Sequence, residues 1–185
     1  MSDINFVKVY EKADADKKVD MICRYYHNFI KIIDGCTDGL CYVIFNDKIK
    51  KRKSDISELG VRVQNSGRHS DSTADVAISK VEIRKAVMNC DFSGDELDGI
   101  PKKDIYCEMA YLLRNMRADF ELFNSQLKLL DDDDSKIFLG YLSKKLNVQD
   151  IADEEGIQLE SAMKKVVRIK QKVKEHMIIY FEGTI

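Results

Sequence analysis

The sequence predicts an all-α protein, and three observations support that prediction. The 185 residues contain one proline and nine glycines, whereas an all-β chain needs many turns built from these residues. Apolar residues recur at spacings of three and four, as they do on one face of a helix. Apolar residues make up 44% of the chain, which is enough for a core and excludes full disorder. We expect an N-terminal helical bundle or antiparallel coil, followed by a compact unit of short helices at residues 131–185.

The residue pattern in the first third of the chain predicts a tail and two helices. Residues 1–16 are polar and weakly patterned, so we expect a flexible tail. An amphipathic helix follows over residues 17–34, and Gly35 is expected to end it. Residues 37–59 predict a further helix rather than a strand, because a lone strand would have no partner elsewhere in the chain.

The residue pattern in the middle of the chain predicts two more helices. With the preceding helices they form a helical N-terminal region over residues 17–130. Polar linkers are expected near 60–72 and 90–103, on either side of a helix that runs from about residue 73 to Asn89. Residues 104–130 carry the best helical pattern in the chain. Their near-heptad stripe includes Leu112, Met116, Phe120, Phe123 and Leu127.

This stripe leaves two interpretations open. The N-terminal helices of the same chain could cover it, in which case it is ordinary core. If the helix over 17–34 is too short to cover it, an apolar seam remains and favours a homodimer held by the N-terminal region.

The last third of the chain has the start and stop signals of short helices. The run Asp131–Asp134 is favourable at a helix N-terminus and precedes a helix expected over 135–145. Asn147 is a good N-cap, and Asp150 stands three residues later in the capping-box position. The helix that they begin is expected to end at Gly156, because glycine adopts the left-handed conformation of a C-cap without a side-chain clash.

A second helix is expected to begin at Gln158 or Leu159, after Ile157 has returned to the core. Two short helices joined by a glycine turn are typical of a helix-turn-helix. The small Ala152 would let the two helices cross closely. The apolar face of the second helix consists of Ala162, Val166, Ile169 and Val173.

The segment VQDIADEEGIQLESAMKKVVRIKQKV resembles region four of the bacterial sigma factors. The family pattern is matched here by Asp150-Ile151-Ala152, Gly156-Ile157, Ala162, Val166 and Arg168-Ile169. The segment RVQNSGRHSDSTADVAISKVEIRKAV is similar to small sigma-like regulators of Firmicute phages and mobile elements. The resemblance implies a sequence-specific, DNA-binding transcription regulator that acts with RNA polymerase. A complete small sigma factor is an alternative that the chain length allows.

Local charge supports DNA contact by the second helix of this motif. Residues 1–130 carry 21 basic and 21 acidic residues, whereas residues 159–176 carry six basic and two acidic ones. Such a local excess is typical of a phosphate-facing surface, although an ordinary solvated helix face is the alternative. The candidates for base edges are Gln158, Glu160, Ser161 and Lys164, and those for phosphates are Lys165, Arg168 and Lys172.

Acidic clusters in the same region favour a different class of function. Asp131–Asp134 and Asp153–Glu155 would repel DNA if they shared a surface with Lys164 and Arg168. In that case the chain would be a helical protein-interaction module that does not bind DNA.

Catalysis, cofactors and metals are not expected. The three histidines stand in no nucleophile motif, and there is no phosphate-binding glycine loop, so we expect neither an enzyme nor a cofactor. Four potential zinc ligands lie within nineteen residues, but their spacing is unlike that of the common zinc motifs. They are Cys23, His27, Cys36 and Cys41.

The N-terminus has no apolar signal core, and the longest apolar run, Leu40–Phe45, is too short to span a membrane. We therefore expect a cytoplasmic protein with reduced thiols and no membrane segment.

Overall fold

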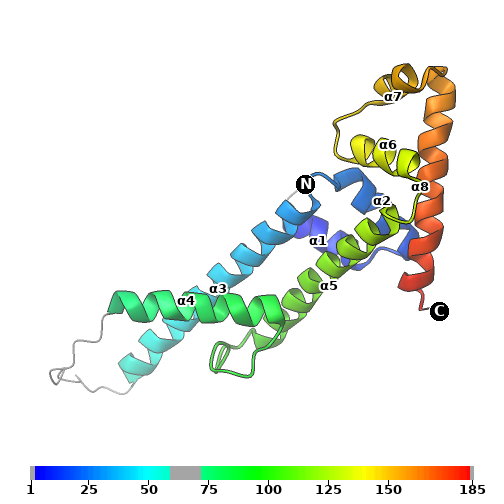
Figure 1. Cartoon of the computed structure of the whole chain (residues 1–185). Helices are drawn as coiled ribbons and strands as arrows, with labels where there is room; N and C mark the ends of the chain where they lie inside the picture. Colours follow the sequence, from blue (N-terminus) through cyan, green and yellow to red (C-terminus); the bar gives the residue numbers. More distant parts are fainter. Residues whose placement is uncertain (1–2, 59–71, 184–185) are drawn as a thin grey trace. The chain divides into compact units, whose positions relative to one another are not determined.

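The computed structural model describes residues 3–58 and 72–183, and all regular structure within them is helical (Figure 1). This confirms the all-α prediction. No helix among these residues is long and apolar enough to cross a bilayer. The linker expected near 60–72 lies outside the described residues except for Ser72, and residues 90–102 form a connection of turns, bends and irregular structure between two helices. The helices are α1 (Asp3–Glu11), α2 (Ala15–Tyr25), α3 (Phe29–Glu58), α4 (Ser72–Asn89), α5 (Lys103–Leu127), α6 (Asp132–Leu142), α7 (Val148–Glu155) and α8 (Leu159–Phe181).

The chain divides into two compact units. The first consists of residues 1–32 and 116–185, and the second of residues 33–115. In the first unit α8 packs against α2, α6 and α7. The C-terminal helices therefore share a unit with the N-terminal ones, whereas the sequence placed a boundary at residue 131. Contacts between segments so distant along the chain leave no signal in local periodicity.

The helix α1 stands where the sequence predicts a flexible tail. Phe6, Val7 and Tyr10 are buried, and the Tyr10 hydroxyl donates a hydrogen bond to Asp119 at 2.9 Å. Burial raises the pKa of the Asp119 carboxyl, although the bond from Tyr10 and the charge of Lys18 oppose that shift. The tail prediction is wrong for residues 3–11, because burial of three side chains in the tertiary structure stabilises a helix of only nine residues.

An aromatic cluster joins α1, α3 and α5 in the first unit. Phe29 is fully buried, stacks on Phe120 with ring centroids 5.3 Å apart, and meets Phe6 and Tyr10 edge-on at 5.8 and 5.6 Å. Phe123 is also fully buried within the chain. The stripe expected over 104–130 is therefore core at Met116, Phe123 and Leu127, whereas Leu112 and Phe120 are partly exposed. The homodimer stays a prediction.

The second unit packs α4 against α3. Arg84 forms an ion pair with Asp38, and the ammonium of Lys80 lies 5.0 Å from the centre of the Phe45 ring. The start of α5 joins the same unit, because the Tyr106 hydroxyl donates to Asp47 at 2.6 Å. The core of this unit includes Ile33, Leu40, Ile44, Ile83, Val87, Leu97, Ile100 and Leu113.

The helix break near the first glycine differs from the prediction. The sequence places it at Gly35, but α3 runs through that residue, and the break falls at residues 26–28. A continuous buried face spans Gly35, since Ile33, Thr37 and Leu40 are all buried. Packing of that face outweighs the low helix propensity of one glycine.

Replacing Gly35 or Gly39 with alanine is expected to raise the free energy of unfolding by about 0.5–1 kcal/mol each. A Cβ atom at either position meets no atom within 4 Å, so only the gain in helix propensity remains. Urea denaturation followed by circular dichroism measures the change. A glycine that ended the helix in a left-handed conformation would give the opposite sign, and a loss of stability would contradict the continuous α3.

Candidate nucleic-acid interface

The N-terminus of α7 is held by the predicted capping box. The Asn147 side chain accepts hydrogen bonds from the backbone N–H groups of Gln149 and Asp150 at 2.8 and 3.1 Å. The Asp150 carboxylate accepts one from the Asn147 N–H at 2.7 Å. These bonds satisfy donors that the first turn of a helix leaves unpaired, so the start of α7 is fixed locally.

The turn after α7 is also as predicted. Gly156 has φ 63° and ψ 33°, the left-handed conformation, and the Ile157 N–H donates to the Ala152 carbonyl at 3.0 Å. The expectation that Ile157 returns to the core is wrong, because its side chain is 37% exposed. Buried Ile151 and Ala152 of α7 and Ala162 of α8 supply the core side chains on either side of the turn.

Replacing Gly156 with alanine is expected to lower the free energy of unfolding by about 1–2 kcal/mol. The added Cβ has open space around it, so the cost is the left-handed backbone conformation alone. Thermal unfolding of this variant and of Gly35→Ala in the same experiment measures the expected decrease and increase in stability side by side. Equal effects of the two substitutions would contradict the assigned turn.

The helix α8 buries one face and exposes the other. Ala162, Val166, Ile169 and Val173 are buried, as predicted, and Met177 extends their row. Figure 1 shows α7 meeting the N-terminal end of α8 at a sharp turn, with α6 beside α8. The opposite face of the first turns of α8 is therefore open to solvent.

All four candidates for base edges lie on exposed positions. Gln158 occupies the N-cap of α8 without a side-chain capping bond, and Ser161 is exposed. Glu160 and Lys164 form an ion pair at 2.7 Å on the helix surface. The spacing brings Glu160, Ser161, Lys164 and Arg168 to one side of the helix.

The three candidates for phosphates differ in how freely they can act. The structure gives the exposed Arg168 no ion-pair partner among the described residues. Lys165 is only 18% exposed and is bound to Glu155 at 2.6 Å. Lys172 lies 3.5 Å from the carboxylate of Asp134. Arg168 is thus the one candidate of the three whose charge is available without breaking an ion pair.

The remaining cations of α8 bind acidic residues of α2. Lys170 lies 2.8 Å from Asp20, and Lys174 lies 2.7 Å from Asp16 and 3.4 Å from Asp20. Burial raises the pKa of Asp20, but the two lysines outweigh it and hold that pKa below its ordinary value. The hydrogen bond to Asp16 raises the pKa of Lys174. Five of the six cations counted in the sequence are therefore ion-paired within this unit.

Sequence reasoning did not predict an apolar row on the exposed surface of α8. Leu159, Met163 and Val167 follow one another at four-residue spacing, and all three are exposed. The spacing was visible in the sequence. Their exposure depends on where α2 and α6 leave α8 uncovered.

No group of three or more His, Cys, Asp or Glu side chains is placed to hold a metal ion within residues 3–58 and 72–183. Burial raises the pKa of the Cys23 thiol to about 12, which favours the protonated thiol at neutral pH. Burial lowers the pKa of His27, and the charges of Lys144 and Lys31 lower it further.

Comparison of the chain with protein-family models, with curated proteins and with solved structures finds no match.

Proposed function

We propose that the protein is a sequence-specific transcription regulator that binds double-stranded DNA through a helix-turn-helix formed by α7, the turn at Gly156 and α8. The observation that carries the proposal is the exposed N-terminal part of α8, which follows a capped helix and a left-handed glycine. This is the arrangement in which a recognition helix enters the major groove. Within the same unit, α2 and α6 pack against α8 and support it.

Side chains at the N-terminal end of α8 would read the sequence. Gln158, Glu160, Ser161 and Lys164 carry donors and acceptors suited to base edges, and all are exposed. Arg168 stands one turn beyond Lys164 and would bind a phosphate. Lys165 and Lys172 would add phosphate contacts only after Glu155 and Asp134 release them.

RNA polymerase is the partner that the sigma-like resemblance suggests. A regulator would stimulate a promoter that polymerase holoenzyme already recognises, whereas a complete small sigma factor would start transcription with core polymerase alone. In vitro transcription with core enzyme and with holoenzyme separates these two roles.

DNA binding is tested by letting the full chain select duplexes from a random library. The affinity for a selected duplex is then measured by fluorescence anisotropy between about 50 and 200 mM salt. We expect an enriched motif and an affinity that falls with salt. The slope of log K against log salt should be about −0.9 for each phosphate neutralised. Absence of duplex binding at low salt, with and without polymerase, would overturn the proposal.

A second candidate, a protein-interaction module without DNA binding, is favoured by the ion pairs of α8 and by its exposed apolar row. The double variant Asp153→Asn, Glu155→Gln distinguishes the two. For a DNA-binding protein we expect duplex affinity to rise about threefold to fivefold, because two negative charges near α8 are removed and Lys165 is freed. Anisotropy at low salt measures the change. Asp75→Asn is the control, because it also neutralises a carboxylate but does so in α4. An unchanged or undetectable affinity would favour the interaction module.

A further inference from the structure

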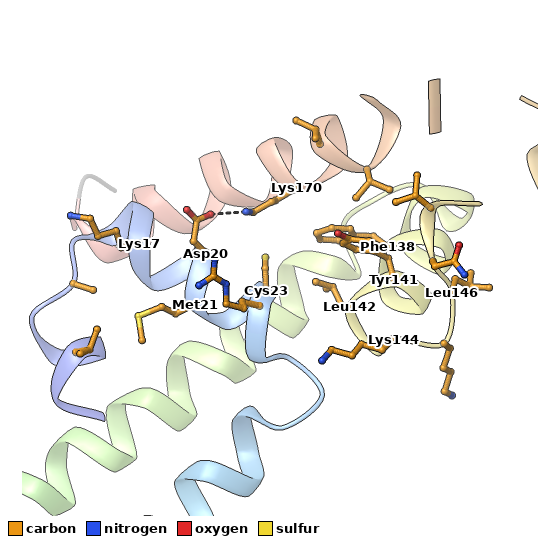
Figure 2. Close-up of a pocket in the computed structure, with 18 of the residues that line it drawn as sticks. Lys17, Asp20, Met21, Cys23, Phe138, Tyr141, Leu142, Lys144, Leu146 and Lys170 are labelled. Carbon is orange, nitrogen blue, oxygen red and sulfur yellow. Dashed lines mark ion pairs between the residues drawn. The ribbon is translucent and has the colours of Figure 1, made fainter. Parts of the chain in front are cut away.

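The first unit has a large groove between α1 and α2 on one side and α6 with the loop after it on the other (Figure 2). It has a volume of about 1660 Å³, which exceeds the roughly 300–1,000 Å³ of a small-molecule pocket. An α-helix of three turns, about 10 Å wide and 16 Å long, occupies roughly 1,200 Å³. The groove is therefore of a size that fits a helical segment.

The floor of the groove is apolar. Val9 of α1, Tyr141 of α6 and Val167 of α8 line it with exposed apolar surface, above the buried side chains of Phe138 and Leu142. Met21 of α2 and Leu146 of the loop after α6 line its two sides in Figure 2. A floor of this kind suits a peptide with an apolar face better than it suits a phosphate backbone.

The lining holds seven basic and two acidic residues, and the acidic ones are already engaged. Asp20 is bound to Lys170, and Asp150 is bound to the backbone N–H of Asn147. Five cations of the lining are exposed and have no ion-pair partner among the described residues: Lys8, Lys12, Arg24, Lys144 and Lys145. Five available cations of this unit thus lie around the groove, whereas most of the charge of α8 is neutralised.

In the turn after α6, Lys144 adopts a backbone conformation that is unfavourable for a residue with a side chain. Lys144 has φ 58°, in the left-handed region that glycine adopts most readily at the end of a helix. A glycine here would relieve the conformation and would remove one charge from the rim. The position therefore offers a variant that changes binding without threatening the fold.

We propose that this groove is a docking site for an acidic amphipathic helix of a partner protein, with the apolar stripe of that helix on the floor and its carboxylates on the unpaired lysines and Arg24. The match of apolar floor and basic rim to such a helix carries the proposal. None of the seven DNA candidates lines the groove. A regulator could therefore hold DNA and a protein partner through different residues.

The probe for the test is a fluorescein-labelled helical peptide of about 14 residues, with leucines at i, i+3, i+4 and i+7 and glutamates elsewhere. Its anisotropy is measured with the full chain. We expect binding that a scrambled peptide of equal composition and a polyglutamate peptide do not match. The variants Lys144→Gly and Met21→Glu should each weaken binding about fivefold to tenfold. Arg168→Ala should leave it unchanged.

Thermal unfolding verifies that each variant is folded, and Lys144→Gly is expected to be at least as stable as the original chain. Equal binding of the scrambled or polyglutamate peptide would overturn the proposal, because charge alone would then suffice. It would also be overturned if Lys144→Gly weakened duplex DNA binding but not peptide binding, which would make the groove a phosphate surface. The peptide result does not depend on whether α8 binds DNA.

Discussion

Replacing Phe29 with alanine is expected to lower the free energy of unfolding by about 3–5 kcal/mol. The side chain is fully buried at the first residue of α3, and its ring contacts those of Phe6, Tyr10 and Phe120. Alanine would remove these ring contacts and leave a cavity among helices that come from distant parts of the chain. Urea denaturation followed by circular dichroism measures the loss, which is a large share of the stability of an ordinary domain.

The matched control is Tyr111→Ala. Tyr111 is an exposed aromatic residue of α5, with the guanidinium of Arg114 at 5.0 Å from its ring centre. Its removal is expected to cost less than about 1 kcal/mol. Similar losses for the two variants would contradict the position of Phe29 at the centre of the cluster.

Replacing Arg168 with alanine is expected to weaken binding of duplex DNA about tenfold to a hundredfold, the value of one charge-assisted hydrogen bond of about 1.5–3 kcal/mol. Arg168 is exposed on α8 and has no ion-pair partner among the described residues, so no internal contact is lost with it. Because it is assigned to a phosphate, the loss should be similar for all sequences, and the salt slope should become shallower by about one unit.

Lys85→Ala is the control for that experiment, since it removes one exposed cation from α4 and should leave the affinity within a factor of two or so. The salt slope makes the assignment specific. A loss confined to one base position would show that Arg168 reads a base, and no loss at all would remove Arg168 from the interface.

Sequence patterns predicted α7 and its turn in detail, for a local reason. A capping box and a left-handed glycine are formed by residues within four positions of one another, so the interactions that fix them are present in the sequence itself. The buried face of α8 was predictable on the same ground, because Ala162, Val166, Ile169 and Val173 repeat with the helical period.

Three features depended on contacts that no local pattern records. The helix α1 forms where a tail was expected, because Phe6 and Tyr10 reach the aromatic cluster of α3 and α5. The helix α3 continues through Gly35, because Ile33 and Leu40 bury one face on both sides of it. Ile157 stays at the surface although the sequence placed it in the core.

The sequence by itself determined the helical class, the capped α7, the glycine turn and the period of α8, since each depends on residues within a turn or two of one another. Only the tertiary structure decided which charges are available. Asp16 and Asp20 of α2 neutralise lysines of α8 that stand about 150 positions away, while lysines of α1 and of the loop after α6 come together unpaired around the groove. Ion pairing acts through space over a few ångströms, so most cations of the basic stretch visible in the sequence are neutralised, and the unpaired cations around the groove come from other segments of the chain.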